Sequence, residues 1–498
     1  MILKRKFVVI LGVLVTLLFF SGNDKSAFPD KDEPFSPITL DAADSLLSKM
    51  SVKEKIGQFF ILKKSPENSK IQPSGYLLND LKDQSNEEIV KSDIPLIFGL
   101  DLIHNKGLND AYSIASPFQL AAIKDKQLVK EYAYSLGESF QAKGFDFVIG
   151  PALDIESSDD SPYTSNWSLG NNAASVFDNA LPIIEGFKMA GILTVAVSFP
   201  GLGSTNRAYE SSPPIIYSKR RALNNADLIP FKSAINSGVQ SIMISNSFAP
   251  GLDSTLNTIA SASPIIIDMI RSQMGFNGLL WVDLTCGGMT NIEDRVTDAF
   301  LAGNDLFIID NDLDLNINRI ESLLDQGAIT EEDIDTRCKQ VLQSKLWLKR
   351  KKKIRSSQDS LRIQRSLELK YRQVFSEALV MVRNSKGLIP IEGLDTLKIA
   401  LIKIGNENND QLESLILRYA PSEVFQLTYA NLEADFQRYN EHADEFNLAL
   451  IIAEPSLEKI ERKRFEMSEH CQSIIDRVSA GKTTALVWNG NAKALRFL

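Results

Sequence analysis

The chain has 498 residues, of which 44% are hydrophobic and 23% charged, and its formal net charge is −9. This is the composition of a globular protein with enough apolar material for a large core. The acidic balance argues against a nucleic-acid partner, because binding phosphates requires concentrated Lys and Arg. We expect two domains, one of them large.

The N-terminus has the pattern of an export segment. Three basic residues, Lys4 to Lys6, precede an apolar run from Phe7 to Phe20. The run is shorter than the roughly 20 residues of a membrane span, so it suits the core of a signal peptide. We predict that residues 1–27 direct export to the periplasm. An uncleaved membrane anchor is the alternative, because no clean small-residue cleavage site follows.

Short apolar runs rich in β-branched residues then recur along the chain, separated by amphipathic stretches of helical length such as Asp125 to Lys143 and Ile265 to Met274. Because these runs are continuously apolar, they are typical of parallel strands buried on both faces. At least six such units predict an α/β fold, a (β/α)8 TIM barrel over residues 28–348, with an open doubly wound sheet as the alternative. The predicted strands are Ile94 to Leu100, Phe145 to Ile149, Ile192 to Phe199, Ser241 to Ser245, Gly278 to Val282 and Asp305 to Ile309.

Polar residues stand at or just past the ends of these strands: Asp101, Asp154, Ser198, Asn246 and Asp283. In a barrel the carboxyl ends of all strands meet at one mouth, so these side chains are expected to share a site. For any single aspartate the alternative is an N-cap of the following helix.

The barrel pattern closes with a helix from Ile334 to Leu348, for which Thr330 is the predicted N-cap. A basic linker, residues 349–370, opens with a run of Lys and Arg that is typical of a solvated linker or of the end of a helix, with contact to an anionic surface as the alternative. Residues 371–498 are predicted to form a smaller α/β domain. Its expected strands are Ala378 to Val382, Leu397 to Ile404, Leu448 to Ile452 and Thr484 to Val487.

Several segments, in consistent order over residues 45–348, resemble motifs of glycoside hydrolase family 3, and most closely its bacterial β-N-acetylhexosaminidase branch. These segments are residues 49–58, 94–101, 144–154, 227–231, 275–283 and 302–305, and the likeness thins to residues 377–384 and 388–390 in the C-terminal region. The resemblance implies a retaining glycosidase that acts on β-linked amino sugars or peptidoglycan fragments. It implies Asp283 as the nucleophile and Asp101 as a sugar ligand. We predict no cofactor and no metal.

The chain departs from the family at the loop that follows Ala196. Where the hexosaminidase branch has Lys-His, this chain has Val197 and Ser198, and Leu202 replaces a second His. The Asp-Ser-His that follows is here Glu210-Ser211-Ser212. In that branch the proton donor is a histidine tuned by an aspartate, and this dyad is missing.

Further candidate residues carry alternatives of their own. Glu210 could replace the missing acid, because a carboxylic acid with a raised pKa is the usual donor in other glycosidases, but a solvated loop residue is the favoured interpretation. Trp167, at a family arginine position, offers a stacking face or packs in the core. His104 could contact a sugar or be incidental. Asp154 is favoured as structural, with substrate binding as the alternative, and Ser198 and Asn246 complete the predicted substrate contacts.

The loss of several catalytic side chains at once indicates that this chain is no longer required to catalyse the original reaction efficiently. We therefore predict an exported family 3 relative with weakened or lost glycosidase activity. The alternative is a non-catalytic periplasmic pseudoenzyme that binds glycans or serves as a scaffold, since fold alone does not establish activity.

Overall fold

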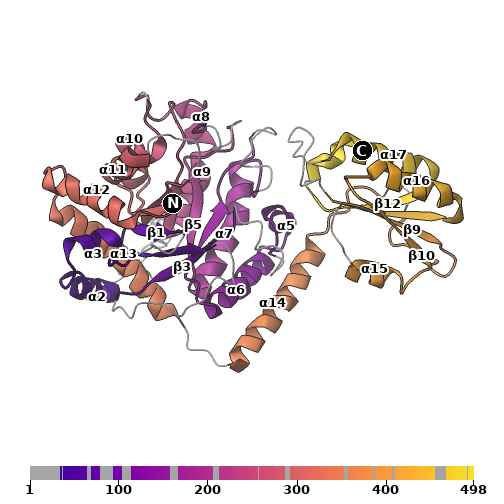
Figure 1. Ribbon diagram of the computed structural model, residues 1–498, viewed down its shortest axis with the longest axis horizontal. Coiled ribbons are helices and arrows are strands. Elements are labelled where there is room, and N and C mark those ends of the chain that lie inside the picture. Colours follow the sequence, from indigo (N-terminus) through magenta and orange to yellow (C-terminus); the bar gives the residue numbers. More distant parts are fainter. Residues whose placement is uncertain are drawn as a thin grey trace, which may run out of the picture.

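The computed structural model describes most of the chain from residue 34 onward. The described ranges are 34–35, 37–63, 69–78, 94–103, 114–157, 167–205, 212–255, 257–285, 292–352, 357–384, 387–405, 410–454, 467–490 and 492–498. Within them, the strands β1 to β8 close into a parallel barrel and β9 to β12 form a second sheet (Figure 1). The predicted TIM barrel followed by a smaller α/β region is confirmed.

The barrel strands follow one another in sequence order, and β8 pairs with β1 to close the ring. They are β1 (Phe60–Leu62), β2 (Gly75–Leu78), β3 (Ile97–Asp101), β4 (Phe147–Ala152), β5 (Leu193–Phe199), β6 (Ser241–Ile244), β7 (Leu279–Asp283) and β8 (Leu306–Ile309). The six strands predicted from the sequence all occur, with ends shifted by a few residues. Strands β1 and β2 were not predicted, because each is only three or four residues long.

Helices surround the barrel, in the order expected of alternating strands and helices. They are α2 (Pro37–Leu47), α3 (Val52–Gly57), α5 (Pro117–Ala122), α6 (Lys126–Ala142), α7 (Ala173–Ala190), α8 (Arg220–Asn225), α9 (Leu228–Asn236), η1 (Ala260–Ala262), α10 (Pro264–Asp268) continued by the π turn η2 (Met269–Gln273), α11 (Ile292–Ala302), α12 (Leu313–Asp325), α13 (Glu331–Lys351) and α14 (Ser357–Glu377). The predicted cap of α13 is present, because Thr330 and Asp333 form a reciprocal capping box.

The core of the barrel has two layers, and the alternation of side chains along β5 shows how they divide. Leu193, Val195 and Val197 belong to the cluster that fills the barrel interior, together with Phe147 and Trp281. Ala196 instead packs in the cluster between strands and helices. Phe199 joins the same cluster because the register of β5 with β6 shifts between Ala196 and Phe199, so the alternation holds only up to Val197. Because successive residues of a strand point to opposite faces, Val197 projects inward near the mouth of the barrel.

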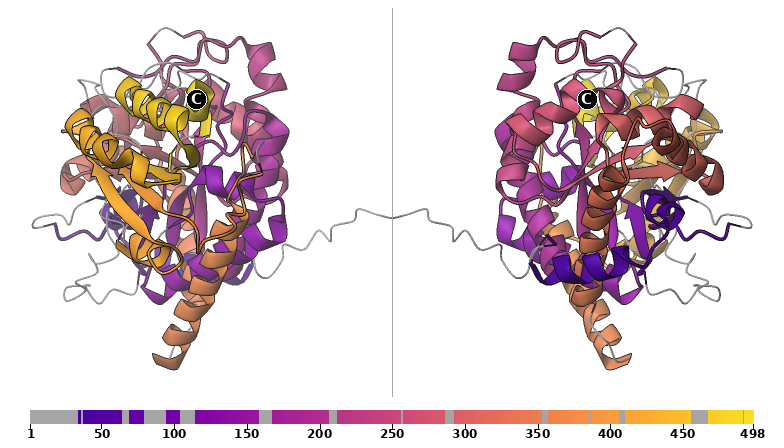
Figure 2. Two further views of the ribbon diagram at one scale, coloured as in Figure 1. Left: turned by 90° about the vertical axis from the view of Figure 1, so that its right-hand side faces the viewer. Right: turned by 90° about the vertical axis from the view of Figure 1, so that its left-hand side faces the viewer.

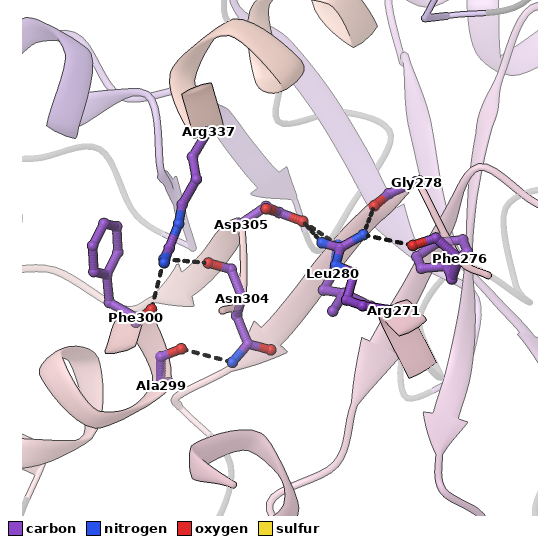
Figure 3. A network of polar contacts seen from close by, with 9 residues as sticks. All are labelled: Arg271, Phe276, Gly278, Leu280, Ala299, Phe300, Asn304, Asp305 and Arg337. Carbon is purple, nitrogen blue, oxygen red and sulfur yellow. Dashed lines mark hydrogen bonds and ion pairs between the residues drawn. The ribbon is translucent and has the colours of Figure 1, made fainter. Parts of the chain in front are cut away.

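A polar network fixes β7, the strand that carries Asp283, at its opposite end (Figure 3). Asp305, which precedes β8, accepts from Arg271 at 2.5 Å and from the N–H of Leu280 at 2.7 Å. Arg337 of α13 donates to the carbonyls of Phe300 at 2.6 Å and Asn304 at 3.3 Å. The Asn-Asp pair of the late family motif therefore has a structural role at the amino-terminal end of the barrel.

The second sheet is parallel, in the order β10-β9-β11-β12. Its strands are β9 (Ile399–Ile404), β10 (Ser422–Leu427), β11 (Leu448–Ala453) and β12 (Thr483–Trp488), with α15 (Asp410–Ile416), α16 (Leu432–His442), η3 (Ala443–Glu445), α17 (Glu469–Gly481) and η5 (Ala492–Phe497). Helix α14 packs along α6 and leads to this domain, as Figures 1 and 2 show, and Lys370 pairs with Glu131 at 2.5 Å.

One expectation for the connecting region was wrong. The predicted strand from Ala378 to Val382 is not a strand, and its four large apolar side chains, residues 379–382, are exposed. Strand propensity alone cannot form a strand without a neighbouring edge to pair with, and no described strand pairs with this segment. The basic run lies at a helix end, one of the two interpretations given above, because Lys349 to Lys351 form the last turn of α13; α14 then begins at Ser357 and covers most of the remaining predicted linker.

The predicted export segment lies outside the described residues. Among the helices that the structure describes, none has the length and apolar character needed to cross a membrane.

Candidate active site

The structure brings five of the predicted site residues to the same end of the barrel. Asp101 and Asp283 are the last residues of β3 and β7, Ser198 is the next-to-last residue of β5, and Asp154 and Asn246 each lie two residues past a strand, β4 and β6. Parallel strands of a closed barrel expose their carboxyl ends at one mouth, so these residues share it. Their placement agrees with the strand-end pattern in the sequence.

Asp283 is largely buried, and both of its carboxylate oxygens accept hydrogen bonds. The backbone N–H and the hydroxyl of Thr285 donate to Oδ1 at 2.8 and 2.6 Å. The ammonium of Lys63 lies 3.2 Å from Oδ2. Because Trp281 stands two residues earlier and faces the barrel interior, Asp283 points toward the same axis. The carboxylate is thus held in one orientation by three donors.

Sequence reasoning missed Lys63, although it follows β1 as directly as the predicted residues follow their strands. Its backbone N–H donates to the carbonyl of Ile309 at the end of β8, and its side chain reaches Asp283 and the hydroxyl of Thr285. Applying the strand-end pattern to the short run Phe60–Leu62 would have found it.

Asn246 supports Asp283 through the backbone. Its amide nitrogen donates to the carbonyl of Asp283 at 2.6 Å, and its amide oxygen accepts from Ser261 of η1 at 2.7 Å. Asn246 is 3% exposed. Asn246 therefore positions the end of β7, and its role as a substrate contact stays a prediction.

Asp154 holds the loop on which the family would carry its Lys-His pair. Its carboxylate accepts the backbone N–H of Ser198 at 3.2 Å and of Leu202 at 2.7 Å. The pKa of Asp154 is raised to about 7, chiefly by burial and in smaller part by the charge of Asp227, while the two backbone donors act to lower it. These contacts support the structural role that the sequence analysis favoured.

Asp227, at the start of α9, packs against the same loop, and burial raises its pKa to about 6. A Cβ atom at Gly201 would lie 3.1 Å from the Cβ of Asp227, and Gly201 has a φ of 118°. Only glycine adopts this conformation readily at so close an approach. Gly201 thus preserves the backbone path of the loop, independently of the side chains that the loop carries.

The side chains of this loop are apolar where the family has catalytic groups. Val197 and Leu202 are each 2% exposed, Val197 in the barrel interior and Leu202 in the layer beneath the helices. Ser198 is half-buried. None of these three side chains carries a group that titrates near neutral pH, so none can replace the histidine of the dyad.

The remaining predicted residues divide into two groups. Asp101 is half-buried at the mouth, where its Oδ1 accepts the N–H of Ile103 at 2.8 Å. Trp167 is half-buried and packs against both layers of the core, which fits the packing alternative. His104 and Glu210 lie outside the described residues, so their roles stay predictions.

The second domain reaches the barrel beside this mouth. Lys493 of η5 pairs with Glu156 at 3.0 Å, and Glu156 lies two residues past Asp154 in the segment that follows β4. The Glu156 side chain is only 7% exposed. Residues of the second domain are therefore close to the segment that holds the catalytic-type loop. No group of three or more acidic, His or Cys side chains suited to a metal occurs among the described residues.

The comparisons with known proteins agree with this geometry. The family model described as "Glycosyl hydrolase family 3 N terminal domain" matches residues 44–344, more than half of the chain. A "Beta-N-acetylglucosaminidase/beta-glucosidase" of Cellulomonas fimi is 23% identical over 330 residues, which cover 61% of this chain and 58% of the relative. A "Beta-hexosaminidase" of Thiobacillus denitrificans is 28% identical over 244 residues, which cover 44% of this chain and 63% of the relative. The chain thus spans less than two thirds of the length of these curated relatives.

Solved structures show the same fold at low sequence identity. A family 3 β-N-acetylglucosaminidase from Paenibacillus sp. str. FPU-7 superposes with a TM-score of 0.70 at 17% identity, over 90% of this chain and 92% of the other. A structure described as "Beta-glucoside phosphorylase BglX" gives a TM-score of 0.73 at 17% identity, over 95% of each chain. At this identity the likeness concerns the fold alone.

Proposed function

Because the chain belongs to glycosyl hydrolase family 3 and is related to the β-hexosaminidases, we propose that it is an exported protein that binds β-linked amino-sugar glycans and hydrolyses them only weakly. The family membership and the relationship rest on the match over residues 44–344 and on the curated relatives. Export, the glycan class and the reduced activity are the proposal.

One observation carries the proposal: the nucleophile position after β7 is intact, whereas the loop after β5 lacks the Lys-His pair that the family carries there. Asp283 is oriented at the barrel mouth by Thr285 and Lys63. The loop from Ser198 to Thr205 keeps its path through Asp154 and Gly201 but carries buried apolar side chains. The site can therefore hold a nucleophile against a sugar without a histidine to protonate the leaving group.

The expected loss of rate follows from the chemistry. Retaining hydrolysis needs attack by a carboxylate and protonation of the leaving oxygen, and general acid help is worth about 10²–10⁴ in rate. Substrates with leaving groups that depart as stable anions need no such help. We therefore expect activated aryl glycosides to be cleaved far better than natural β-linked oligosaccharides.

A pseudoenzyme that only binds glycans is the second candidate. Both carboxylate oxygens of Asp283 are engaged by protein donors, which favours a site at rest over one poised for attack. A donor from the second domain is the third route, supported by the contact of Lys493 with Glu156 near the mouth. The weak hydrolase, whatever its proton donor, and the pseudoenzyme differ in a single observable, the formation of a bond to Asp283.

The test is covalent labelling. The full chain is incubated with an activated 2-deoxy-2-fluoro glucosyl donor, in which fluorine replaces the C2 substituent, and the intact protein is weighed. We expect slow formation of one adduct, located at Asp283 by peptide mapping and lost in Asp283→Asn. Asp310→Asn, an exposed aspartate after β8, is the matched control and should label like the wild type.

If no adduct forms, calorimetry with muropeptides and chito-oligosaccharides shows whether the protein binds glycans without cleaving them or does neither. Heat of binding without an adduct would support the pseudoenzyme. Absence of both would contradict the proposal in either form.

Export is tested separately. We expect the protein in the extracytoplasmic fraction, and N-terminal sequencing of that protein decides between cleavage near residue 27 and retention of the segment as an anchor. Recovery of the uncleaved chain in the cytoplasmic fraction would contradict this part of the proposal.

A further inference from the structure

Lys63 stands in an unusual place for a cation, beside the carboxylate that the proposed reaction would use. Its Nζ lies 3.2 Å from Oδ2 of Asp283 and also donates to the hydroxyl of Thr285. The side chains of Lys63 and Asp283 are 26% and 12% exposed, so water screens the pair only partly. The lysine comes from β1 and crosses the end of β8 to reach β7.

We propose that Lys63 holds Asp283 as a free carboxylate and so opposes formation of its bond to the sugar. The inference rests on the proposed function, in which Asp283 is the nucleophile. It assigns a reason for weak activity that is independent of the lost histidines.

The first half-reaction shows how the opposition arises. A lone pair of an Asp283 oxygen forms a bond to the anomeric carbon, while the bond from that carbon to the leaving oxygen breaks and its electron pair departs with the leaving group. The carboxylate loses its negative charge when it becomes an ester. Lys63 stabilises the charged carboxylate more than the neutral ester, so it raises the barrier measured from the free protein.

The second half-reaction responds in the opposite sense. Water attacks the anomeric carbon and releases a proton to the solvent, while the bond to Asp283 breaks and its electron pair returns to the carboxylate. Lys63 stabilises the returning charge, and measured from the adduct it lowers the barrier. Removing the charge of Lys63 should therefore speed labelling and slow release of the sugar.

A cationic ligand provides a readout that needs no reaction. A protonated iminosugar such as isofagomine carries an ammonium group where the anomeric carbon of a sugar would lie, so it competes with Lys63 for the carboxylate of Asp283. Without Lys63 this ligand should bind more tightly. If the ion pair between Lys63 and Asp283 only stabilised the fold, removing Lys63 would not increase the affinity for the iminosugar.

Three variants separate these roles. Lys63→Met keeps the length of the side chain without its charge, and Lys63→Arg keeps the charge. Lys55→Met is the matched control, because it breaks another ion pair, Lys55 with Asp335 at 2.6 Å, that does not involve Asp283. Asp283→Asn combined with Lys63→Met removes the group through which Lys63 is proposed to act.

The experiment is calorimetric titration of each full-length variant with isofagomine, followed by labelling with a dinitrophenyl 2-fluoro glycoside. We expect Lys63→Met to bind the iminosugar about tenfold more tightly and, where labelling occurs, to label about tenfold faster, because the variant lacks the attraction between the ammonium and the carboxylate that the wild type gives up in both events. Lys63→Arg and Lys55→Met should match the wild type, and the double variant should lose the gain.

Equal or weaker iminosugar binding by Lys63→Met, the same gain in Lys55→Met, or no binding by any variant would overturn the inference. A gain in iminosugar affinity without labelling in any variant would support the inference about Lys63 while contradicting the hydrolytic part of the proposed function.

Discussion

Replacing Asp154 with asparagine tests how the loop over the barrel mouth is held. Asp154 is 2% exposed, and its carboxylate accepts the backbone N–H groups of Ser198 and Leu202. Asparagine keeps the shape and one acceptor but cannot ionise. The variant therefore removes a titration and leaves most of the packing in place.

The magnitude follows from the pKa of Asp154, which burial raises from its ordinary 3.8 to about 7. Between these two values the folded protein binds the proton more tightly than the unfolded chain. The free energy of unfolding therefore falls as the pH rises from about 4 to about 7. A difference of about three pH units corresponds to about 4 kcal/mol.

The assay is urea unfolding of the wild type and Asp154→Asn at a series of pH values from about 4 to 8. We expect the stability of the variant relative to the wild type to improve by several kcal/mol across this range. In Asp227→Asn, the part of the fall in unfolding free energy with pH that is due to Asp154 should be smaller. The reason is that removing the neighbouring negative charge lowers the pKa of Asp154. Parallel pH profiles for wild type and Asp154→Asn would refute the reasoning.

Three further predictions follow from buried or capping groups. Asn246→Ala leaves the carbonyl of Asp283 and the hydroxyl of Ser261 without this partner, so urea unfolding should show a free energy of unfolding lower by about 1–3 kcal/mol. The control Asn318→Ala, at an exposed position, should not show this loss. Burial lowers the pKa of Lys345 to about 7, so the wild type should gain stability as the pH rises from about 7 to 10, and Lys345→Met should lose that slope in the same assay. Thr330→Ala removes the capping box of α13 and should cost about 1 kcal/mol in urea unfolding; an unchanged midpoint would contradict the assigned cap.

The long, continuously apolar strands of the barrel could be predicted from the sequence, and the short or alternating ones could not. Strands β5 and β7 are buried along their whole length apart from Ser198, and their apolar runs identify them directly. Strand β10 alternates between buried and partly exposed residues at the edge of the second sheet, and its pattern is too weak to recognise. Residues 378–382 have a strong strand pattern but no paired neighbour.

The location of the site could likewise be predicted, but the direction of its side chains could not. The strand-end pattern places Asp101, Asn246 and Asp283 correctly at one mouth. It cannot show that Asp154 turns toward backbone donors of the loop, or that Lys63 reaches across β8. Those outcomes depend on three-dimensional packing between segments far apart in the chain.

The central claim is that Asp283 remains a usable nucleophile in a site that has lost its proton donor. The most direct measurement is the mass of the intact protein after incubation with an activated 2-fluoro glycosyl donor, alongside the rates at which it cleaves an activated aryl glycoside and a natural β-linked oligosaccharide. We predict a single adduct at Asp283, slow cleavage of the aryl glycoside and hardly any cleavage of the oligosaccharide. Rapid turnover of the natural substrate, or an adduct that persists in Asp283→Asn, would contradict the account.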